Sequence, residues 1–123
     1  MPMERSEVMS DNILETIRKM IGAGIDKEFD DDLIVHINSA LGTLAQVGAC
    51  PKGSAITDGS ESWQDLFQDS QIAAKAKTYI YFKVRLGFDP PQSSFAAESI
   101  KTMAEEELWR INSDAEYDGD DNE

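Results

Sequence analysis

The chain has 123 residues and a formal net charge of -13, which limits both its fold and its partners. This length supports one domain with a modest core. The acidic balance repels nucleic acid phosphates and acidic membrane surfaces, so sequence-specific nucleic acid binding is disfavoured. A single cysteine, Cys50, excludes an internal disulfide and a site built from several cysteines. No run approaches the ~20 apolar residues of a membrane span or resembles a signal peptide, so we expect a soluble protein that is not secreted by a standard route.

Apolar periodicity and the distribution of charge divide the chain into three predicted parts. Residues 1–10 carry no periodic pattern and are predicted to form a flexible arm. Residues 11–112 hold sixteen acids against ten bases and form the predicted helical domain. Residues 113–123 hold six acids and no base, without apolar periodicity, which is typical of a disordered tail.

Apolar residues at helical spacing predict two helices before a long loop. The first has Ser10 or Asp11 as its N-cap and ends near Gly22. The second begins at the acidic run 30–32, where negative charge favours a helix start through capping and the helix dipole, and it ends at residues 47–48. The apolar positions are Ile13, Leu14, Ile17, Met20 and Ile21 in the first helix and Leu33, Ile34, Ile37, Leu41, Leu44 and Val47 in the second.

Residues 49–62 (ACPKGSAITDGSES) are rich in glycine, serine and threonine and predict a long loop. Loops of this length inside a compact domain are uncommon and tend to be functional or disordered. Residues 57–59 suit a tight turn that closes a small hairpin. Ser62 is a suitable cap for a short helix over residues 63–67, whose Trp63 and Phe67 would anchor the loop to the core.

The segment 72–88 (IAAKAKTYIYFKVRLGF) is predicted to be the central helix. Its second half is apolar in nearly every direction, and such a helix must be surrounded by other helices. Asp69 or Ser70 is the predicted N-cap, while Gly87 and the prolines at 90–91 are predicted to end the helix.

A last helix is predicted after Ser93 or Ser94. Its apolar residues at helical spacing are Phe95, Ile100, Met103, Ala104, Leu108 and Ile111. Glu105, Glu106 and Glu107 lie in its C-terminal half, where basic groups of a partner would relieve their unfavourable interaction with the dipole. The fold class is therefore all-α, a small bundle of about four to five helices with a long loop between helices two and three.

Residues with catalytic or ligand-binding chemistry do not form a recognisable set. His36 has no second histidine or cysteine with which to hold a metal, and Cys50 has no histidine near it in sequence. The acidic run 30–32 lacks the other ligands of a calcium loop, so helix capping is the better explanation. No glycine-rich phosphate loop is present. We therefore predict no catalytic residues, no metal and no cofactor, and a protein that is not an enzyme.

Basic residues gather on the central helix at Lys75, Lys77, Lys83 and Arg85, with aromatic residues between them. One interpretation is a patch for nucleic acid or an acidic protein. The simpler one is that the lysine stems lie along the helix while the aromatic rings pack inside. In a third, acidic residues 105–107 of one subunit meet Lys83 or Arg85 of the next, which gives a head-to-tail contact that closes a ring.

Several segments together resemble the head–tail connector family of tailed bacteriophages, also called adaptor or head-completion proteins. The resemblance covers residues 12–112, and its most specific part is the run 79–95, where an aromatic helix, Asp-Pro-Pro and a Ser-Ser-Phe cap follow in that order. The segments that carry it are 13–21 (ILETIRKMI), 32–41 (DLIVHINSAL), 56–59 (ITDG) with Trp63, 77–86 (KTYIYFKVRL), 88–95 (FDPPQSSF) and 106–112 (EELWRIN).

The resemblance implies a structural protein of the virion neck, made in the bacterial cytoplasm. Members of the family assemble as a ring, typically a dodecamer, under the portal, and join the DNA-filled head to the tail or the next neck protein. Double-stranded DNA passes through the ring without specific binding, which the acidic composition favours. The implied partners are other copies of the chain, the portal protein and the next neck or tail-completion protein, with no membrane.

Two sets of residues are predicted to serve this assembly. The subunit interface set is Tyr79, Tyr81, Phe82, Lys83, Arg85, Phe88, Glu105, Glu106 and Glu107. The partner docking set is Trp109, Ile111, Asp114, Glu116 and Tyr117. An alternative function from a different class is a small acidic regulator, or DNA mimic, that binds the nucleic acid site of another protein; it would not need to form a ring.

Overall fold

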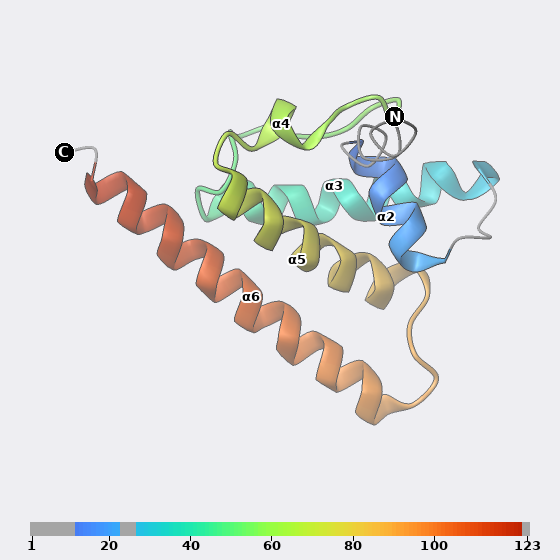
Figure 1. Ribbon diagram of the computed structural model, residues 1–123. Coiled ribbons are helices and arrows are strands. Elements are labelled where there is room, and N and C mark those ends of the chain that lie inside the picture. Colours follow the sequence, from blue (N-terminus) through green and yellow to red (C-terminus); the bar gives the residue numbers. More distant parts are fainter. Residues whose placement is uncertain (1–11, 23–26, 122–123) are drawn as a thin grey trace, which may run out of the picture.

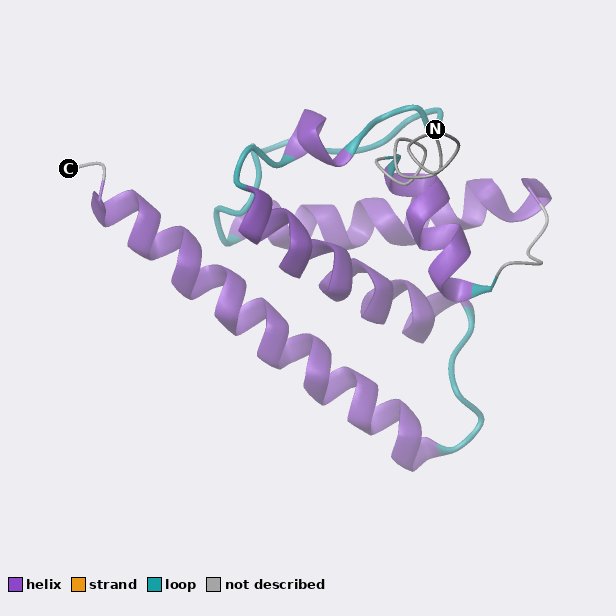
Figure 2. Ribbon diagram, viewed as in Figure 1, coloured by secondary structure: helices purple, strands orange, loops and turns teal. Residues whose placement is uncertain are grey.

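The chain folds as a small all-α bundle, in agreement with the predicted fold class (Figures 1 and 2). The computed structural model describes residues 12–22 and 27–121, with side chains as far as residue 115, so the predicted arm lies outside the described residues. No strand occurs in these ranges, which contain five α-helices and a short 3-10 helix. The elements are α2 (Ile13–Ile21), η1 (Lys27–Phe29), α3 (Asp30–Gln46), α4 (Trp63–Leu66), α5 (Ser70–Phe88) and α6 (Ser94–Asp121).

Helix α5 is the centre of the bundle, as predicted. It lies between α3 and α6, and α2 and α4 also pack against it (Figure 1). Tyr79, Ile80 and Val84 in its second half are buried by these neighbours, whereas Tyr81, Phe82 and Phe88 are half-buried, so the apolar excess of the helix is covered in part. Asp69 is the N-cap, because its side chain accepts hydrogen bonds from the backbone N–H groups of Gln71 and Ile72.

The N-caps of the two helices before the loop differ from the prediction, although the second helix does begin at Asp30. Asn12, rather than Ser10 or Asp11, caps α2: its side-chain oxygen lies 2.9 Å from the amide nitrogen of Glu15. Residues 30–32 do lie in the first turn of α3, but no side chain caps this helix. Asp30 instead accepts two-pronged hydrogen bonds from the guanidinium of Arg18, at 3.0 to 3.2 Å, and so joins α3 to α2.

The loop between α3 and α4 has no regular structure but is attached along its length. The side chain of Asn38 donates to the carbonyl of Ile56 at 3.0 Å and accepts from its N–H at 2.8 Å. The Ile56 side chain is buried in the core. Residues 57–59 form bends, and no small hairpin closes there, contrary to the prediction. Near the loop's end, Asn12 and Ser62 form an isolated antiparallel bridge. Ser62 forms a capping box with Asp65 at the start of α4, as predicted.

Helix α5 ends at Phe88, directly after Gly87 and before the prolines at 90–91, as predicted. Gly87 itself still lies within the last turn of the helix. A Cβ atom at this position would lie 2.6 Å from Nδ1 of His36 on α3. The glycine therefore allows the C-terminal end of α5 to pack directly on the imidazole ring.

Helix α6 is longer than predicted and presents its apolar residues on two sides. Ser93 caps it, since its hydroxyl accepts from the N–H of Ala96 at 2.9 Å, and the helix runs to Asp121 rather than ending near residue 112. Ala104 and Ile111 are buried, whereas Phe95 and Met103 are exposed. At about 100° per residue, Phe95 lies on the side opposite Ala104, so one helical stripe cannot bury both.

Candidate functional site

The predicted interface residues of α5 range from buried to exposed. Tyr79 is only 3% exposed, so it is a core residue and is not accessible to a neighbouring subunit. Tyr81, Phe82 and Phe88 are half-buried, and Lys83 is exposed. The rings of Tyr81 and Phe82 lie 5.7 Å apart between centroids, which brings these two members of the set together.

Phe88 belongs to a different group at the C-terminal end of α5. Its ring makes edge contacts with the ring of Phe29, at 5.8 Å between centroids, and with that of His36, at 6.4 Å. These contacts explain how His36 is used in the fold: it packs between helices.

Lys75 and Lys77, the two lysines in the first half of α5, interact within their own chain. Lys75 forms an ion pair with Asp114 on α6. The Lys77 ammonium lies 5.4 Å from the centre of a Trp63 ring, where the negative face of the ring attracts it. The arrangement supports the interpretation that the lysine stems lie along the helix while the aromatic rings pack inside.

Arg85 is also used internally. Its guanidinium donates to the Asp89 backbone carbonyl at 2.6 Å and to the Tyr81 hydroxyl at 3.4 Å. It therefore holds the chain where α5 ends. Lys83 is the basic residue of the predicted interface set that remains exposed, and it makes no ion pair with another described residue.

The acidic residues predicted to meet Lys83 or Arg85 of a neighbouring subunit lie on α6. Glu105 and Glu106 are exposed, whereas Glu107 is half-buried and accepts from Arg110 at 3.2 Å. The structure therefore presents two free-standing carboxylates on the outer side of the helix, and the single chain does not bring them together with Lys83.

The predicted docking set is also divided. The Trp109 side chain is 68% exposed and available to a partner, but Ile111 is fully buried, which corrects its assignment. It lies on the inner side of α6, about 200° around the helix from Trp109. Asp114 is paired with Lys75. The side chains of Glu116 and Tyr117 lie outside the described residues.

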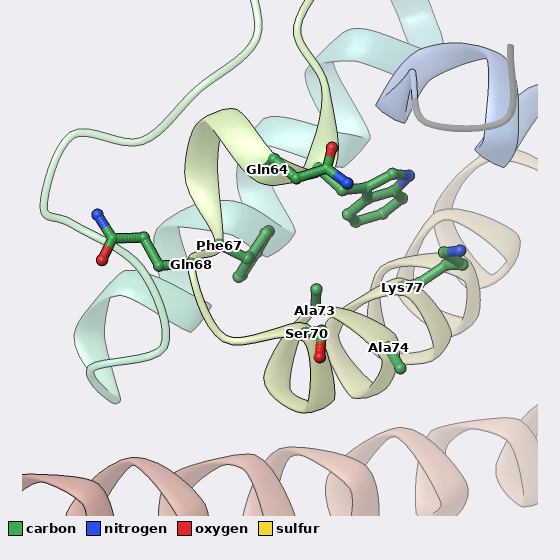
Figure 3. Close-up of a pocket in the computed structure, with 8 residues that line it drawn as sticks. Gln64, Phe67, Gln68, Ser70, Ala73, Ala74 and Lys77 are labelled. Carbon is green, nitrogen blue, oxygen red and sulfur yellow. The ribbon is translucent and has the colours of Figure 1, made fainter. Parts of the chain in front are cut away.

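A groove between α4 and the start of α5 was not predicted. Figure 3 shows it, with Phe67 and Ala73 facing each other across it and Lys77 at one end. Its volume is about 210 Å³. A sequence signal existed, because an aromatic pair (Trp63 and Phe67) precedes two successive alanines on the next helix, but only the tertiary structure brings these residues together.

Cys50 is buried, and its sulfur lies 3.9 Å from the carbonyl oxygen of Leu41. Burial raises the pKa of the Cys50 thiol, although contact with the Ser54 hydroxyl opposes this in part. A thiol that stays protonated is a poor nucleophile and metal ligand. Within residues 12–22 and 27–121, no group of three or more His, Cys, Asp or Glu residues is arranged to hold a metal ion.

Among the described helices, none combines the length and the apolar character that crossing a membrane requires. The described residues also present three surfaces to which a partner would have access. These surfaces are the exposed side of α6, the C-terminal half of α5 and the groove beside α4.

Comparison with known proteins agrees with the resemblance seen in the sequence. The model of a family described as phage connector protein matches residues 13–118, from the start of α2 almost to the end of α6. No curated protein and no solved structure matches the chain significantly. Because the family match spans most of the chain and all of the described helices, the chain belongs to the phage connector protein family.

Proposed function

We propose that this connector is a structural component of the phage neck, in which copies of the chain form a ring under the portal and join the DNA-filled head to the tail or the next neck protein. The observation that carries the proposal is the family match over residues 13–118.

A ring requires each subunit to present two different, complementary surfaces. The outer side of α6 carries exposed apolar and acidic residues, among them Phe95, Glu105 and Glu106. Across the bundle, the groove beside α4 combines aromatic rings and alanines with polar side chains, and Lys77 lies at one end. Surfaces that differ in this way suit a contact between successive subunits rather than a twofold dimer.

The charge of the chain suits a channel through which DNA passes. At -13 per subunit, like-charge repulsion opposes tight binding of the polymer. Lys75 and Arg85 have polar partners within the chain, so the basic residues of α5 do not form a row of free phosphate contacts. In this proposal, double-stranded DNA moves along the ring without specific contacts.

We assign docking on the portal to the second half of α6 and the acidic residues that follow. Trp109 is an exposed aromatic residue of the kind that anchors protein interfaces. The acidic run beyond residue 115 would pair with basic residues of the portal, an interaction that salt weakens.

The first experiment is the mass of the purified protein by light scattering, alone and with a purified portal ring. A closed oligomer, or a monomer that binds in many copies per portal, is the expected result. A protein that stays small, ignores the portal and instead binds a nuclease or repressor would reject the connector role and favour the acidic regulator.

A variant with the carboxylates of residues 116–123 changed to amides tests the portal assignment at constant chain length. Weaker portal binding at low salt, with the difference from wild type vanishing at high salt, is expected. Equal binding at every salt concentration would reject the role of these acids.

A further inference from the structure

Phe95 is the most exposed large apolar side chain among the described residues, at 82% of its surface. It lies in the first turn of α6, on the side opposite the buried Ala104. Glu98 follows three residues later and shares this side of the helix, as do Ser99 and Thr102. The outer side of this half of α6 is therefore an aromatic projection beside a carboxylate, with small side chains that let another surface approach.

The groove beside α4 has the complementary shape (Figure 3). Trp63 and Phe67 form its aromatic side, with ring centroids 6.0 Å apart, and Ala73 and Ala74 line it from α5. The polar residues Gln64, Gln68 and Ser70 complete the lining with Lys77. Its volume of about 210 Å³ lies below the roughly 300 to 1,000 Å³ of sites for small molecules. The groove therefore has room for one large side chain rather than for a cofactor.

The charges match as well. Lys77 lines the groove and is held over the ring of Trp63, yet it forms no ion pair with any described carboxylate. Glu98 is exposed and likewise unpaired within the described chain. The apolar part of the lining, which comes from Trp63, Phe67 and the two alanines, suits the ring of Phe95.

We propose that Phe95 of one copy enters the groove formed by α4 and α5 of the next copy, with Glu98 beside Lys77. The projection and the groove belong to different surfaces of the same chain, so each copy uses one of each and the contact repeats. This inference rests on the proposed function, because it identifies the contact between subunits of the ring. It leaves Trp109 and the acidic residues beyond it free for the portal.

The test measures self-association of the full chain by sedimentation equilibrium, without portal. Phe95→Ala removes the projection, and Ala73→Met fills the groove with a flexible side chain. Each is expected to weaken self-association about tenfold or more, as for a central aromatic contact. Trp109→Ala is the matched control, since it removes another exposed aromatic residue of α6, and it should leave self-association unchanged. Urea unfolding of each variant checks that the fold is retained.

The charge pair gives a test that does not depend on truncation. Glu98→Lys and Lys77→Glu should each weaken self-association, and a mixture of the two variants should associate more strongly than either alone. If either substitution had only damaged the fold of its own chain, mixing the two variants would not restore self-association.

Three results would overturn the inference. Phe95→Ala would leave self-association unchanged, Trp109→Ala would weaken self-association instead, or the wild-type chain would not self-associate even at millimolar concentration. The proposed function is judged separately, by portal binding. A chain that binds the portal in many copies but never self-associates would retain the connector role and reject this contact, whereas self-association through the groove without portal binding would do the reverse.

Discussion

The loop before α4 and helix α6 are attached to the bundle in opposite ways. The loop, residues 47–62, has no regular structure, yet Asn38 holds both backbone polar groups of Ile56 and the Ile56 side chain is buried. Helix α6 is the longest element, but Ala104 and Ile111 are its fully buried apolar residues among those described. A segment without regular backbone hydrogen bonding can therefore be joined to the core by its side chains, as a helix is.

The difference fits a division of labour. The loop closes the core around α2 and α3, whereas α6 covers α5 with one side and leaves the other side exposed. A helix that keeps its own backbone bonds can present side chains to a partner without exposing unmatched polar groups. We therefore expect substitutions in the loop to act mainly on stability and those on the outer side of α6 mainly on assembly.

Ile56→Ala should have the largest effect on stability. Removing a fully buried branched side chain should lower the free energy of unfolding by about 3 kcal/mol, through lost burial and the cavity left behind. Urea unfolding followed by circular dichroism measures it. Val35→Ala, at an exposed position of α3, is the control and should stay within about 0.5 kcal/mol of wild type. Equal effects of the two variants would mean that the loop is not part of the cooperative core.

Asn38→Ala should come next, at about 2 kcal/mol, because it leaves the N–H and the carbonyl of Ile56 without their partner. Hydrogen exchange at the Ile56 amide should also accelerate more than exchange in α6. Ser39→Ala, on the exposed side of the same helix, is the control. If the Ile56 amide kept its protection in Asn38→Ala, the side-chain bonds would not be what holds the loop.

Tyr79→Phe tests the α3 side of the central helix, with an expected cost of about 1 kcal/mol at neutral pH from the lost contact with the Thr43 hydroxyl. Burial raises the pKa of Tyr79 above its ordinary value of 10.0, and the Thr43 hydroxyl opposes this in part. Below pH 10.0 both states keep the proton, so the contribution of this residue to stability is complete. At higher pH the unfolded chain loses the proton first, and stability falls as the pH rises toward the folded-state pKa.

The measurement is urea unfolding of both proteins between neutral pH and the alkaline range. Wild type should lose more stability above pH 10.0 than Tyr79→Phe, because phenylalanine cannot ionise. Parallel curves for the two proteins would show that Tyr79 does not titrate differently in the folded state.

Much of the fold follows from local patterns in the sequence. The 3.6-residue periodicity located α2, α3 and α5, and the capping signals at Ser62 and Asp69 are where the structure has them. At the start of α2, three successive residues (Ser10, Asp11 and Asn12) are all good caps, so local chemistry does not select Asn12. Its bridge to Ser62 does, and that contact depends on the tertiary structure.

The candidate surfaces were harder to predict because apolar spacing in α6 fits more than one stripe. Phe95 and Met103 recur at helical spacing with Ala104 and Ile111, but a single face against α5 covers the second pair alone. Gly87 shows a related limit. A glycine near a proline pair predicts the helix end at Phe88, but it does not show that the ring of His36, far away in the sequence, packs against this glycine. Such partners become visible only when the helices are packed together.

The ion pair between Lys75 and Asp114 should make the smallest contribution, although it joins α5 to the second half of α6. Both side chains are about one-third exposed, so solvent and salt screen their attraction and the coupling should be about 0.5 kcal/mol. A double-mutant cycle with Lys75→Met and Asp114→Asn measures it, and the coupling should fall further at high salt. The matched pair Glu107 and Arg110, within one turn of α6, should give a similar value. A coupling above about 2 kcal/mol would mean that this contact, rather than Ala104 and Ile111, fixes α6 on the bundle. In that case a polar contact would hold α6 on the bundle, as the side chain of Asn38 helps to hold the loop, and the contrast between the two regions would no longer hold.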